Sequence, residues 1–447
     1  PLPHAMVTML NQTLLSISKA AEQLDIHADS IRRWEKKGLI KAFRDENNHR
    51  VFSLAEIQRI QAQSMKAPSS AGFKVLQSKN QHLKANSVEL FAGAGGLALG
   101  FENVGIHHEL LVEIDVHASN TLRKNRPNWH VIQDDVRKID FAEYRADIVS
   151  GGFPCQAFSY AGRKLGFEDT RGTLFFEFAR CIKTIQPKIV VGENVKGLLT
   201  HDNGKTLQTM LSVLDELGYR VAYKVLRSQY LDVAQKRERL VIIGIRKDLD
   251  TPFCYPKDNN YIIPLRQALK NVPTSAGQGY TEKKHAIMQL IPQGGYWRDL
   301  PDDLKRSYMG ASYFQGGGKT GMARRLSWDE PSLTLTCNPA QKQTERCHPS
   351  ETRPLTVREY ARIQSFPDNW EFTGSTNAQY KQIGNAVPVN MAYHLGRCVL
   401  AMVNNQPDAE TMEVFNQMPL QTTPQIKVPE TMPLFGRLEI SVPPIHL

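Results

Sequence analysis

Five short apolar segments alternate with stretches of helical pattern, and this alternation limits the fold more than any other feature of the sequence. The segments cover residues 87–91, 109–114, 147–150, 188–192 and 239–245. Interleaved strands and helices are typical of a parallel sheet with helices on both faces. In such sheets a ligand binds beyond the carboxyl ends of the strands. The residues that follow each segment are therefore the first candidates for a functional site.

The composition agrees with a folded chain of several units. The chain has 447 residues, of which 41% are hydrophobic and 22% charged, an ordinary balance for a globular protein. No uninterrupted apolar run approaches the ~18 residues of a membrane span, and no secretory signal is recognisable. The six cysteines include no C-x-x-C pair, so we expect neither a disulfide framework nor a metal site. This cysteine usage fits a reducing cytoplasm.

The charge is strongly basic and unevenly placed. The net charge is +10, which indicates a polyanionic partner, with nucleic acid as the first candidate. Residues 1–86 hold 13 Lys/Arg and 7 Asp/Glu, so +6 of this charge lies in the first fifth of the chain. The alternative is a basic protein whose charge serves solubility alone.

Residues 13–62 predict a small helical unit with a β-wing. Ser16 or Ser18 can cap a first helix, and Asp29 or Ser30 a second one that ends at Gly38. The turn-rich residues 44–50 predict the wing, and Ser53 and Glu56 have the spacing of a capping box. The stretch with "IRRWEKKGLI" resembles the winged helix-turn-helix head of MerR-type regulators. The resemblance implies that the second helix contacts DNA through Arg32, Arg33 and Lys36, whereas the alternative is a docking module with solvated charges.

The first apolar segment runs into "FAGAGGLA", which matches the pattern G-x-G-x-x-A. Such a turn brings backbone N–H groups and a helix N-terminus close to a ligand. Glu113 lies twenty residues after Gly93, where a carboxylate can accept ribose hydroxyls. On these residues alone NAD, FAD and S-adenosylmethionine all fit, and so does a turn without a ligand. Asp134 and Asp135 are further candidates, for an adenine amino group.

A thiol, a carboxyl group and two arginines lie next to three other predicted strands. Cys155 follows "GGFP", Glu193 and Asn194 follow the fourth segment, and "QKRER" precedes the last. Each residue alone is explained as core or salt bridge, but together they suit covalent catalysis on a ring with a polarisable nitrogen. After Cys155, residues 162–172 are polar and glycine-flanked, as in a loop that closes over a substrate and touches phosphates.

Six segments resemble, in the same order, the motifs of the cytosine-C5 DNA methyltransferases. They are "ELFAGAGGL", "GGFPCQAFSYAGRKLGFEDTRGTLFFE", "GENVKGL", "QKRERLVIIG", "RPLTVREYARIQSFPDNW" and "QIGNAVPVN". They span residues 87 to about 400. The resemblance implies an α/β fold: a Rossmann-like, S-adenosylmethionine-dependent methyltransferase sheet with helices on both faces, a smaller target-recognition domain and the N-terminal winged helix-turn-helix.

The resemblance also implies the chemical roles of the candidate residues. Cys155 would attack C6 of a cytosine flipped out of the duplex, and Glu193 would hold N3 and the exocyclic amino group. Arg239 would contact O2 and support Glu193, Arg237 would brace the site, and Asn194 would order the Cys155 loop. S-adenosylmethionine would be the methyl donor, with S-adenosylhomocysteine as product. Its expected binding residues are Phe91, Ala92, Gly93, Gly95, Gly96, Leu97, Glu113, Ile114, Asp135, Val136, Pro154, Leu174, Asn385 and Val387.

The resemblance divides the chain into seven parts. They are a tag-derived or disordered start (1–12), the helix-turn-helix (13–62), a linker (63–86), the catalytic domain (87–246), the target-recognition domain (247–352), the C-terminal part of the catalytic domain (353–403) and a proline-rich tail (404–447). Besides the three head residues, we expect DNA contacts from Gln156, Ser159, Arg163, Lys164, Arg324, Thr336, Gln341, Lys342 and Arg346. The alternative for each is a solvated loop residue.

The expected activity is therefore methylation of cytosine C5 within a short palindromic site of double-stranded DNA. The expected setting is the bacterial cytoplasm, at the nucleoid, with the chain acting as a monomer on DNA, either alone or beside a cognate restriction endonuclease. The head could also bind the chain's own promoter. Two alternatives remain open at this point: a transcription regulator that keeps an enzyme-like body, and a tRNA cytosine methyltransferase.

Overall fold

The computed structural model describes most of the chain between residues 14 and 416. The described residues are 14–24, 28–36, 40–45, 48–54, 56–57, 73–78, 83–154, 173–315 and 319–416, and within them the side chains of residues 29, 30, 33 and 36 are not described. The predicted start, most of the linker and the segment around Cys155 lie outside these residues. So does the end of the predicted tail.

The N-terminal head contains the predicted helices and wing. It consists of β1 (Leu14–Ser16), α2 (Ile17–Gln23), α3 (Ala28–Lys36), β2 (Phe43–Arg44) and β3 (Arg50–Ser53). Ser16 caps α2 by accepting from the Lys19 amide, and β2 and β3 pair antiparallel as the wing. Ser53 accepts from the Glu56 amide, one of the two bonds of the predicted capping box, and the Glu56 carboxylate accepts from the Lys41 amide. Ala20, Ile31 and Phe52 are fully buried in the core of the head.

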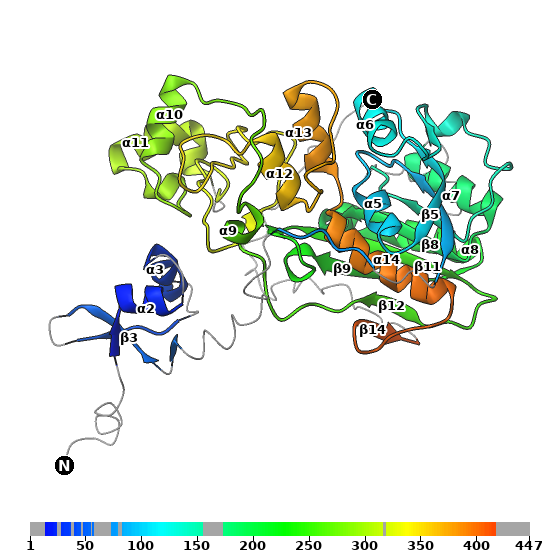
Figure 1. The fold of residues 1–447 in the computed structure, drawn as a ribbon, viewed down its shortest axis with the longest axis horizontal. Helices are drawn as coiled ribbons and strands as arrows, with labels where there is room; N and C mark the ends of the chain where they lie inside the picture. Colours follow the sequence, from blue (N-terminus) through cyan, green and yellow to red (C-terminus); the bar gives the residue numbers. More distant parts are fainter. Residues whose placement is uncertain are drawn as a thin grey trace, which may run out of the picture. The chain divides into compact units, whose positions relative to one another are not determined.

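A seven-stranded sheet forms the centre of the body, in the spatial order β6-β5-β4-β7-β8-β11-β9 (Figure 1). Its strands are β4 (Ala85–Leu90), β5 (Ile106–Val112), β6 (Val131–Ile132), β7 (Ile148–Gly151), β8 (Ile189–Val195), β9 (Tyr219–Arg227) and β11 (Glu238–Arg246). β4 to β8 are mutually parallel. The five predicted segments coincide with β4, β5, β7, β8 and β11, whereas β6 and β9 were not predicted.

The last predicted strand runs in the opposite direction to the expected one. β11 pairs antiparallel with both β8 and β9. Because of this reversal, the first residues of β11 lie at the carboxyl ends of the parallel strands. In a purely parallel sheet the same residues would lie at the far edge, away from the site. The expectation of a parallel sheet is thus wrong for this strand, and the difference has consequences for the site.

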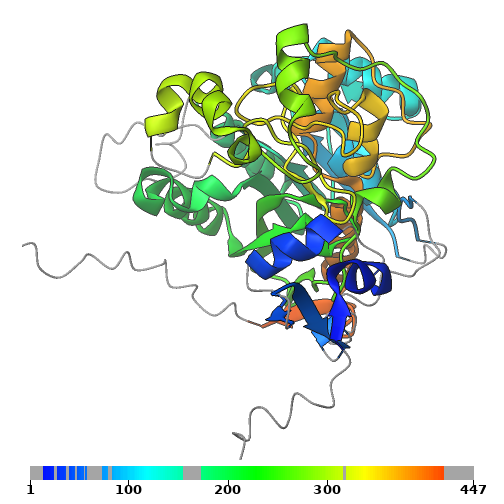
Figure 2. The same ribbon diagram turned by 90° about the vertical axis from the view of Figure 1, so that its left-hand side faces the viewer.

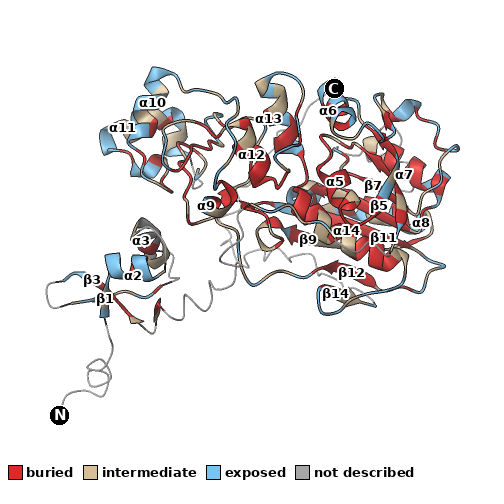
Figure 3. Ribbon diagram, in the orientation of Figure 1, coloured by how far each residue is buried: buried red, intermediate tan, exposed pale blue. Residues whose placement is uncertain are grey.

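Helices cover both faces of the sheet, as predicted. α7 (Leu174–Ile185) and α8 (Lys205–Glu216) pack on one face, in a core with Val88, Leu90 and Val190. α5 (Gly96–Glu102) and α14 (Val389–Val403) pack against each other on the other face. Figure 3 shows the strands and α14 as mainly buried and the outer helices as more exposed. The apolar stretch 376–403 is long enough for a membrane span, but 78% of its most apolar window is buried inside the protein.

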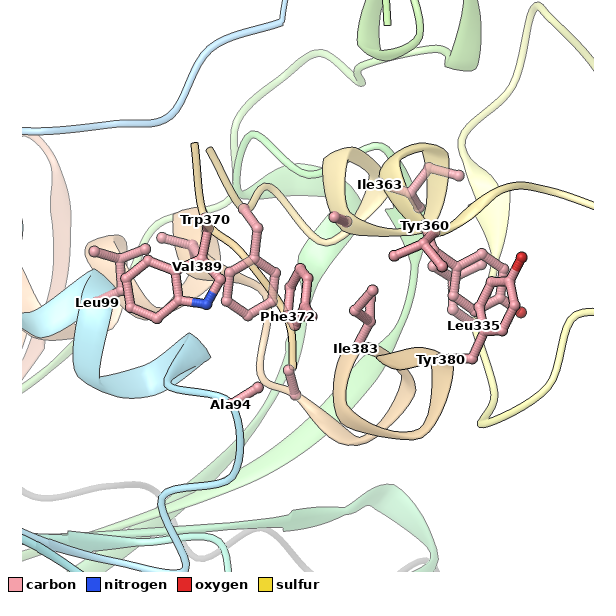
Figure 4. Close-up of a cluster of buried hydrophobic side chains, with 14 of the residues drawn as sticks. Ala94, Leu99, Leu335, Tyr360, Ile363, Trp370, Phe372, Tyr380, Ile383 and Val389 are labelled. Atoms are coloured by element: carbon pink, nitrogen blue, oxygen red, sulfur yellow. The ribbon is translucent and has the colours of Figure 1, made fainter. Parts of the chain in front are cut away.

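The C-terminal part of the chain returns to the glycine turn that follows β4. α6 (Val116–Asn125) contacts α13 (Thr376–Asn385), which packs against α12 (Val357–Ile363), so segments from both ends of the body lie side by side (Figures 1 and 2). Trp370 and Phe372 belong to one hydrophobic core with Ala94 and Leu99, and Tyr380 lies farther along it, against Tyr360 (Figure 4). Trp370 is 1% exposed and Phe366 0%. Both aromatic residues are therefore core residues, and neither ring is exposed for stacking on a base.

Residues 282–347 add a smaller unit with its own core. It contains α10 (Glu282–Gln289) and α11 (Asp302–Met309), and Met288, Trp297 and Leu300 are buried within it. The preceding α9 (Leu265–Ala268) packs instead in the core of the body, against α12. The parallel pair of β10 (Gln235–Lys236) and β13 (Ser332–Leu333) connects this unit to the edge of the sheet.

Two stretches predicted to be linker and tail contain residues that are held by the body. In the linker, the Leu76 amide donates to Asn390 Oδ1 and the Leu76 carbonyl accepts from Asn103 Nδ2, each at 2.9 Å. In the tail, β14 (Met412–Phe415) pairs antiparallel with β12 (Phe253–Pro256). The seven-part division stays a prediction, but residues 73–78 and 412–415 are structurally attached to the body.

Candidate active site

A cavity of about 1010 Å³ lies at the carboxyl ends of the parallel strands. Its wall comes from the ends of β4, β5, β7 and β8, from the start of β11, and from residues 334–337 and 381–387. Segments that are almost 300 residues apart in sequence therefore surround one space. The position agrees with the rule that ligands bind at this edge of such sheets.

One half of the cavity is built around the glycine turn and Glu113. The Glu113 carboxylate accepts from the Gly93 amide at 2.7 Å and from the Asp115 amide at 2.8 Å, one bond to each oxygen. Each oxygen thus keeps a lone pair for a further donor. Burial raises the pKa of Glu113, and the two amide hydrogen bonds oppose this rise. Gly96 lets the turn approach the C-terminal segment, because a Cβ there would lie 2.1 Å from the Val387 carbonyl oxygen.

The predicted cofactor residues fall together in this half. With the exception of Gly95, they all line the cavity: Phe91, Ala92, Gly93, Gly96, Leu97, Glu113, Ile114, Asp135, Val136, Pro154, Leu174, Asn385 and Val387. A Cβ on Gly95 would lie 2.7 Å from Leu122 and 3.2 Å from Trp370, so this glycine serves core packing. Ile114 is 65% exposed, which is unusual for a large apolar side chain and indicates a surface available to a ligand.

The other half of the cavity holds a buried ion pair. Arg239 Nε lies 2.8 Å from Glu193 Oε1, and both side chains are 13% exposed. Glu193 on β8 is opposite Val241 on β11, so Arg239 is its diagonal neighbour on the same face of the sheet. Burial raises the pKa of Glu193 although the arginines counteract this, and burial also lowers the pKa of Arg239. The antiparallel course of β11 is what brings these two side chains together.

Asn194 fixes the chain that leads to Cys155. Its Nδ2 donates to the Phe153 carbonyl oxygen at 2.9 Å, and its Oδ1 accepts from the Val195 amide at 2.8 Å. The residues are held in this way up to Phe153, two positions before the cysteine. Cys155 itself lies outside the described residues, as do Gln156, Ser159, Arg163 and Lys164.

Arg237 is 1% exposed and binds backbone carbonyls from two distant segments. It donates to Leu335 at 3.2 Å and to Gly384 at 3.0 Å. Its Nε has no hydrogen-bond partner among the described residues. Burial lowers the pKa of Arg237 to about 9.

The residues predicted to contact DNA differ in their exposure and lie in different parts of the structure. Arg32 is exposed on α3, and the side chains of Arg33 and Lys36 on the same helix are not described. Gln341 and Lys342 are exposed, and Thr336 lines the cavity.

Two predicted arginines of the smaller unit are bound to backbone carbonyls. Arg324 donates to Gly294, and Arg346, which is 4% exposed, donates to Thr334 and Glu345. Arg346 is better placed to support Thr334 than to reach a base.

Several polar residues that line the cavity were not among the predicted site residues, including Glu89 and Cys337. Glu89 lines the cavity from the last position but one of β4, where it is 1% exposed and opposite Ser150 of β7. Burial, together with the nearby Glu113 carboxylate, raises the pKa of Glu89 to about 8. A single carboxyl group within the apolar segment SVELF is the signal that could have identified it. Nothing in the local sequence distinguishes Cys337.

Comparisons with known proteins agree with this geometry. Residues 85–400 match the family described as C-5 cytosine-specific DNA methylase, and residues 16–52 match the MerR family of regulatory proteins. The type II methyltransferase M.Eco47II of Escherichia coli is 52% identical over 89% of this chain and 98% of its own. M.PspPI of Psychrobacter sp. (strain TA137) is 50% identical over 88% of this chain and 97% of its own. The stretch from residue 85 to residue 447 makes up less than 88% of the chain. Alignments that cover 88% and 89% of the chain must therefore also include residues before position 85.

Solved structures with the same fold are less similar in sequence. A prophage-encoded DNA modification methyltransferase from E. coli has a TM-score of 0.51 at 22% identity, covering 71% of this chain and 99% of its own. A DNMT2 variant from Spodoptera frugiperda has a TM-score of 0.52 at 16% identity, covering 70% and 99%. These likenesses support the fold alone.

The buried carboxyl group of Glu89 predicts a pH-dependent stability. Its pKa is raised in the folded state, so the folded chain binds the proton more tightly, and stability falls as the pH rises from about 4.5 towards 8. Glu89→Gln removes this proton linkage. Between pH 6 and pH 8 the free energy of unfolding of the wild type should therefore fall by about 2 kcal/mol relative to Glu89→Gln. Urea unfolding at both pH values measures this difference.

The exposed Glu109 on β5 provides the control for this measurement. The free energy of unfolding of Glu109→Gln should change between pH 6 and pH 8 by the same amount as that of the wild type. Equal pH dependence in the wild type and in Glu89→Gln would contradict a proton held on Glu89.

Proposed function

Since the chain belongs to the C-5 cytosine-specific DNA methylase family, and is a DNA (cytosine-5-)-methyltransferase of a type II restriction-modification system, we propose how its residues carry out the reaction. The proposal assigns the glycine-turn half of the cavity to S-adenosylmethionine and the Glu193 half to a cytosine flipped out of duplex DNA. The observation that carries it is the buried Glu193–Arg239 pair in the same cavity as the glycine turn and Glu113.

The residues of the glycine-turn half fit S-adenosylmethionine. The free lone pairs of Glu113 suit two ribose hydroxyls, and Phe91, Ile114 and Val136 offer apolar contact to the adenine. Asp135 can accept from the adenine amino group. Backbone amides of the glycine turn and the Asn385 amide face the amino-acid part. When bound, the cofactor supplies a methyl group activated by its sulfonium charge.

In the other half, Glu193 and Arg239 recognise the cytosine ring. N3 of cytosine is an acceptor, so Glu193 must donate a proton to it, and a buried carboxyl group with a raised pKa is suited to this. The other carboxylate oxygen accepts from the exocyclic amino group. Arg239 donates to O2 and stays paired with Glu193, which fixes the orientation of both side chains.

The covalent step is assigned to Cys155. Its thiolate attacks C6, and the electron pair of the C5–C6 double bond moves to C5, where the methyl group is accepted. A base then removes the C5 proton, the double bond re-forms, and the thiolate leaves C6. Asn194 holds the Phe153 carbonyl and thereby positions the residues that precede the thiol.

We assign the DNA contacts to the loop that follows Cys155 and to the smaller unit. Gln156, Ser159, Arg163 and Lys164 are expected at the flipped nucleotide and its phosphates, and Thr336, Gln341 and Lys342 at neighbouring bases. The chain acts as a monomer on double-stranded DNA in the bacterial cytoplasm, beside a cognate restriction endonuclease.

Replacing the nucleophile should stop the reaction without removing the cofactor. Cys155→Ser is expected to lose methylation of duplex DNA by at least about a thousandfold, whereas its affinity for S-adenosylhomocysteine stays within about twofold of the wild type. A duplex with 5-fluorocytosine at the target should form a denaturation-resistant complex with the wild type only, because fluorine blocks removal of the C5 proton. A complex of equal yield in Cys155→Ala would show that another thiol attacks.

The head is proposed to add a second set of DNA contacts, to non-specific DNA or to the chain's own promoter. Its match to MerR regulators and the exposed Arg32 on α3 support this assignment. A chain that begins at residue 73 keeps the segment 73–78 on the body, so it removes the head without exposing Asn390 and Asn103.

That truncation should weaken DNA binding and make it less dependent on salt. The slope of log K against log [salt] is negative, and each lost phosphate contact reduces its magnitude by about 0.9. Fluorescence anisotropy between 50 and 200 mM salt measures this slope, with the full chain as reference. An unchanged slope and affinity would leave the head without a role in DNA binding.

A further inference from the structure

The segment 334–337 of the smaller unit touches the turn 383–387 backbone to backbone. A Cβ on Gly384 would lie 2.4 Å from the Thr336 carbonyl oxygen and 2.9 Å from the Cys337 amide nitrogen. No side chain fits between the two segments at this point. The first segment carries Thr336, a proposed DNA contact, and the second carries Asn385, a proposed cofactor contact.

Two buried side chains from the β10 region hold these segments together. Gln235 Oε1 accepts from the Leu335 amide at 2.8 Å, and its Nε2 donates to Gln364, which in turn donates to the Ile383 carbonyl. Arg237 donates to the carbonyls of both Leu335 and Gly384. Both side chains are at most 1% exposed. The backbone of Cys337 is therefore fixed opposite Asn385.

A single side-chain hydrogen bond continues this connection into the cavity. Cys337 Sγ donates to Asn385 Oδ1 at 3.1 Å, and both residues line the cavity. The other cysteines that the structure describes, Cys181, Cys254, Cys347 and Cys398, are buried, whereas Cys337 is exposed. A primary amide has one acceptor end and one donor end. With Oδ1 engaged by the thiol, the NH₂ group of Asn385 is the end available to a ligand.

We propose that Cys337 is a positioning residue that orients the Asn385 amide, with its NH₂ group towards the cofactor. The inference rests on the proposed function, which places the amino-acid part of the cofactor beside Asn385. The carboxylate of that part is an acceptor, so it needs the donor end of the amide. If the amide turned over, Oδ1 would face the carboxylate and repel it.

Calorimetry with S-adenosylhomocysteine on the full chain, without DNA, tests the inference. Cys337→Ala should bind about 3- to 10-fold more weakly, the range that corresponds to one hydrogen bond. Cys337→Ser keeps a donor and should bind within about twofold of the wild type. Gln343→Ala is the matched control, since Gln343 is exposed in the stretch that follows this segment but does not line the cavity.

A double-mutant cycle distinguishes a positioning role from a general structural one. If Cys337 acts through Asn385, then Cys337→Ala should cause no further loss in an Asn385→Ala background. An equal loss in both backgrounds, or wild-type affinity in Cys337→Ala, would overturn the inference. If the wild type does not bind S-adenosylhomocysteine, the cofactor assignment itself fails, and the inference fails with it.

Alkylation gives a second readout that does not depend on Cys337 variants. In the Cys155→Ser chain, the reaction of Cys337 with iodoacetamide can be followed by peptide mass spectrometry. Saturating S-adenosylhomocysteine should slow this reaction several-fold, because the thiol lies on the wall of the cavity. An unchanged rate would place Cys337 away from the bound cofactor and overturn the inference.

Discussion

The buried ion pair between Glu193 and Arg239 is the interaction on which the site depends. A carboxyl group as deeply buried as Glu193 would be costly to ionise alone, and Arg239 supplies the opposite charge at 2.8 Å. The pair exists because β11 runs antiparallel to β8 and so starts at the edge where β8 ends. The same reversal places Gln235 and Arg237 next to residues 335 and 384. One strand direction thus builds both the Glu193 half of the cavity and its attachment to the smaller unit.

The cavity also explains why the C-terminal segment must return to the start of the body. Gly96 and Gly384 allow backbone contacts that no other residue would permit, and Trp370 lies against Gly95 of the glycine turn. The glycine-turn half of the cavity is complete only when residues from both ends of the body have packed. Binding of a cofactor should therefore stabilise this long-range contact, because it adds interactions that only the packed state offers.

Much of this arrangement could be predicted from the sequence, and the failures have physical reasons. Strand positions follow from short apolar segments, which are local signals. The cofactor residues were expected from the resemblance to the methyltransferase family, and the structure places all of them except Gly95 on the cavity wall, where their role stays a prediction. The direction of β11 is not local, since the same apolar segment suits either orientation. Gly95 and Arg346 have the right residue types for ligand contact, but their neighbours in space assign them to core packing and to backbone carbonyls. Cys337 is placed by its own bond to Asn385, 48 positions further along the chain. The bond from Arg237 to Leu335, which spans 98 positions, holds the neighbouring backbone.

Bisulfite sequencing of plasmid DNA from cells that express the full chain tests the central claim most directly, with Glu193→Gln expressed at the same level for comparison. The account predicts protected cytosines in one recurring short sequence with the wild type, and protection of only a small fraction of these sites with Glu193→Gln. Equal protection by the two chains would contradict the role assigned to the Glu193–Arg239 pair. No protection by the wild type would contradict the cytosine-methylating reaction itself.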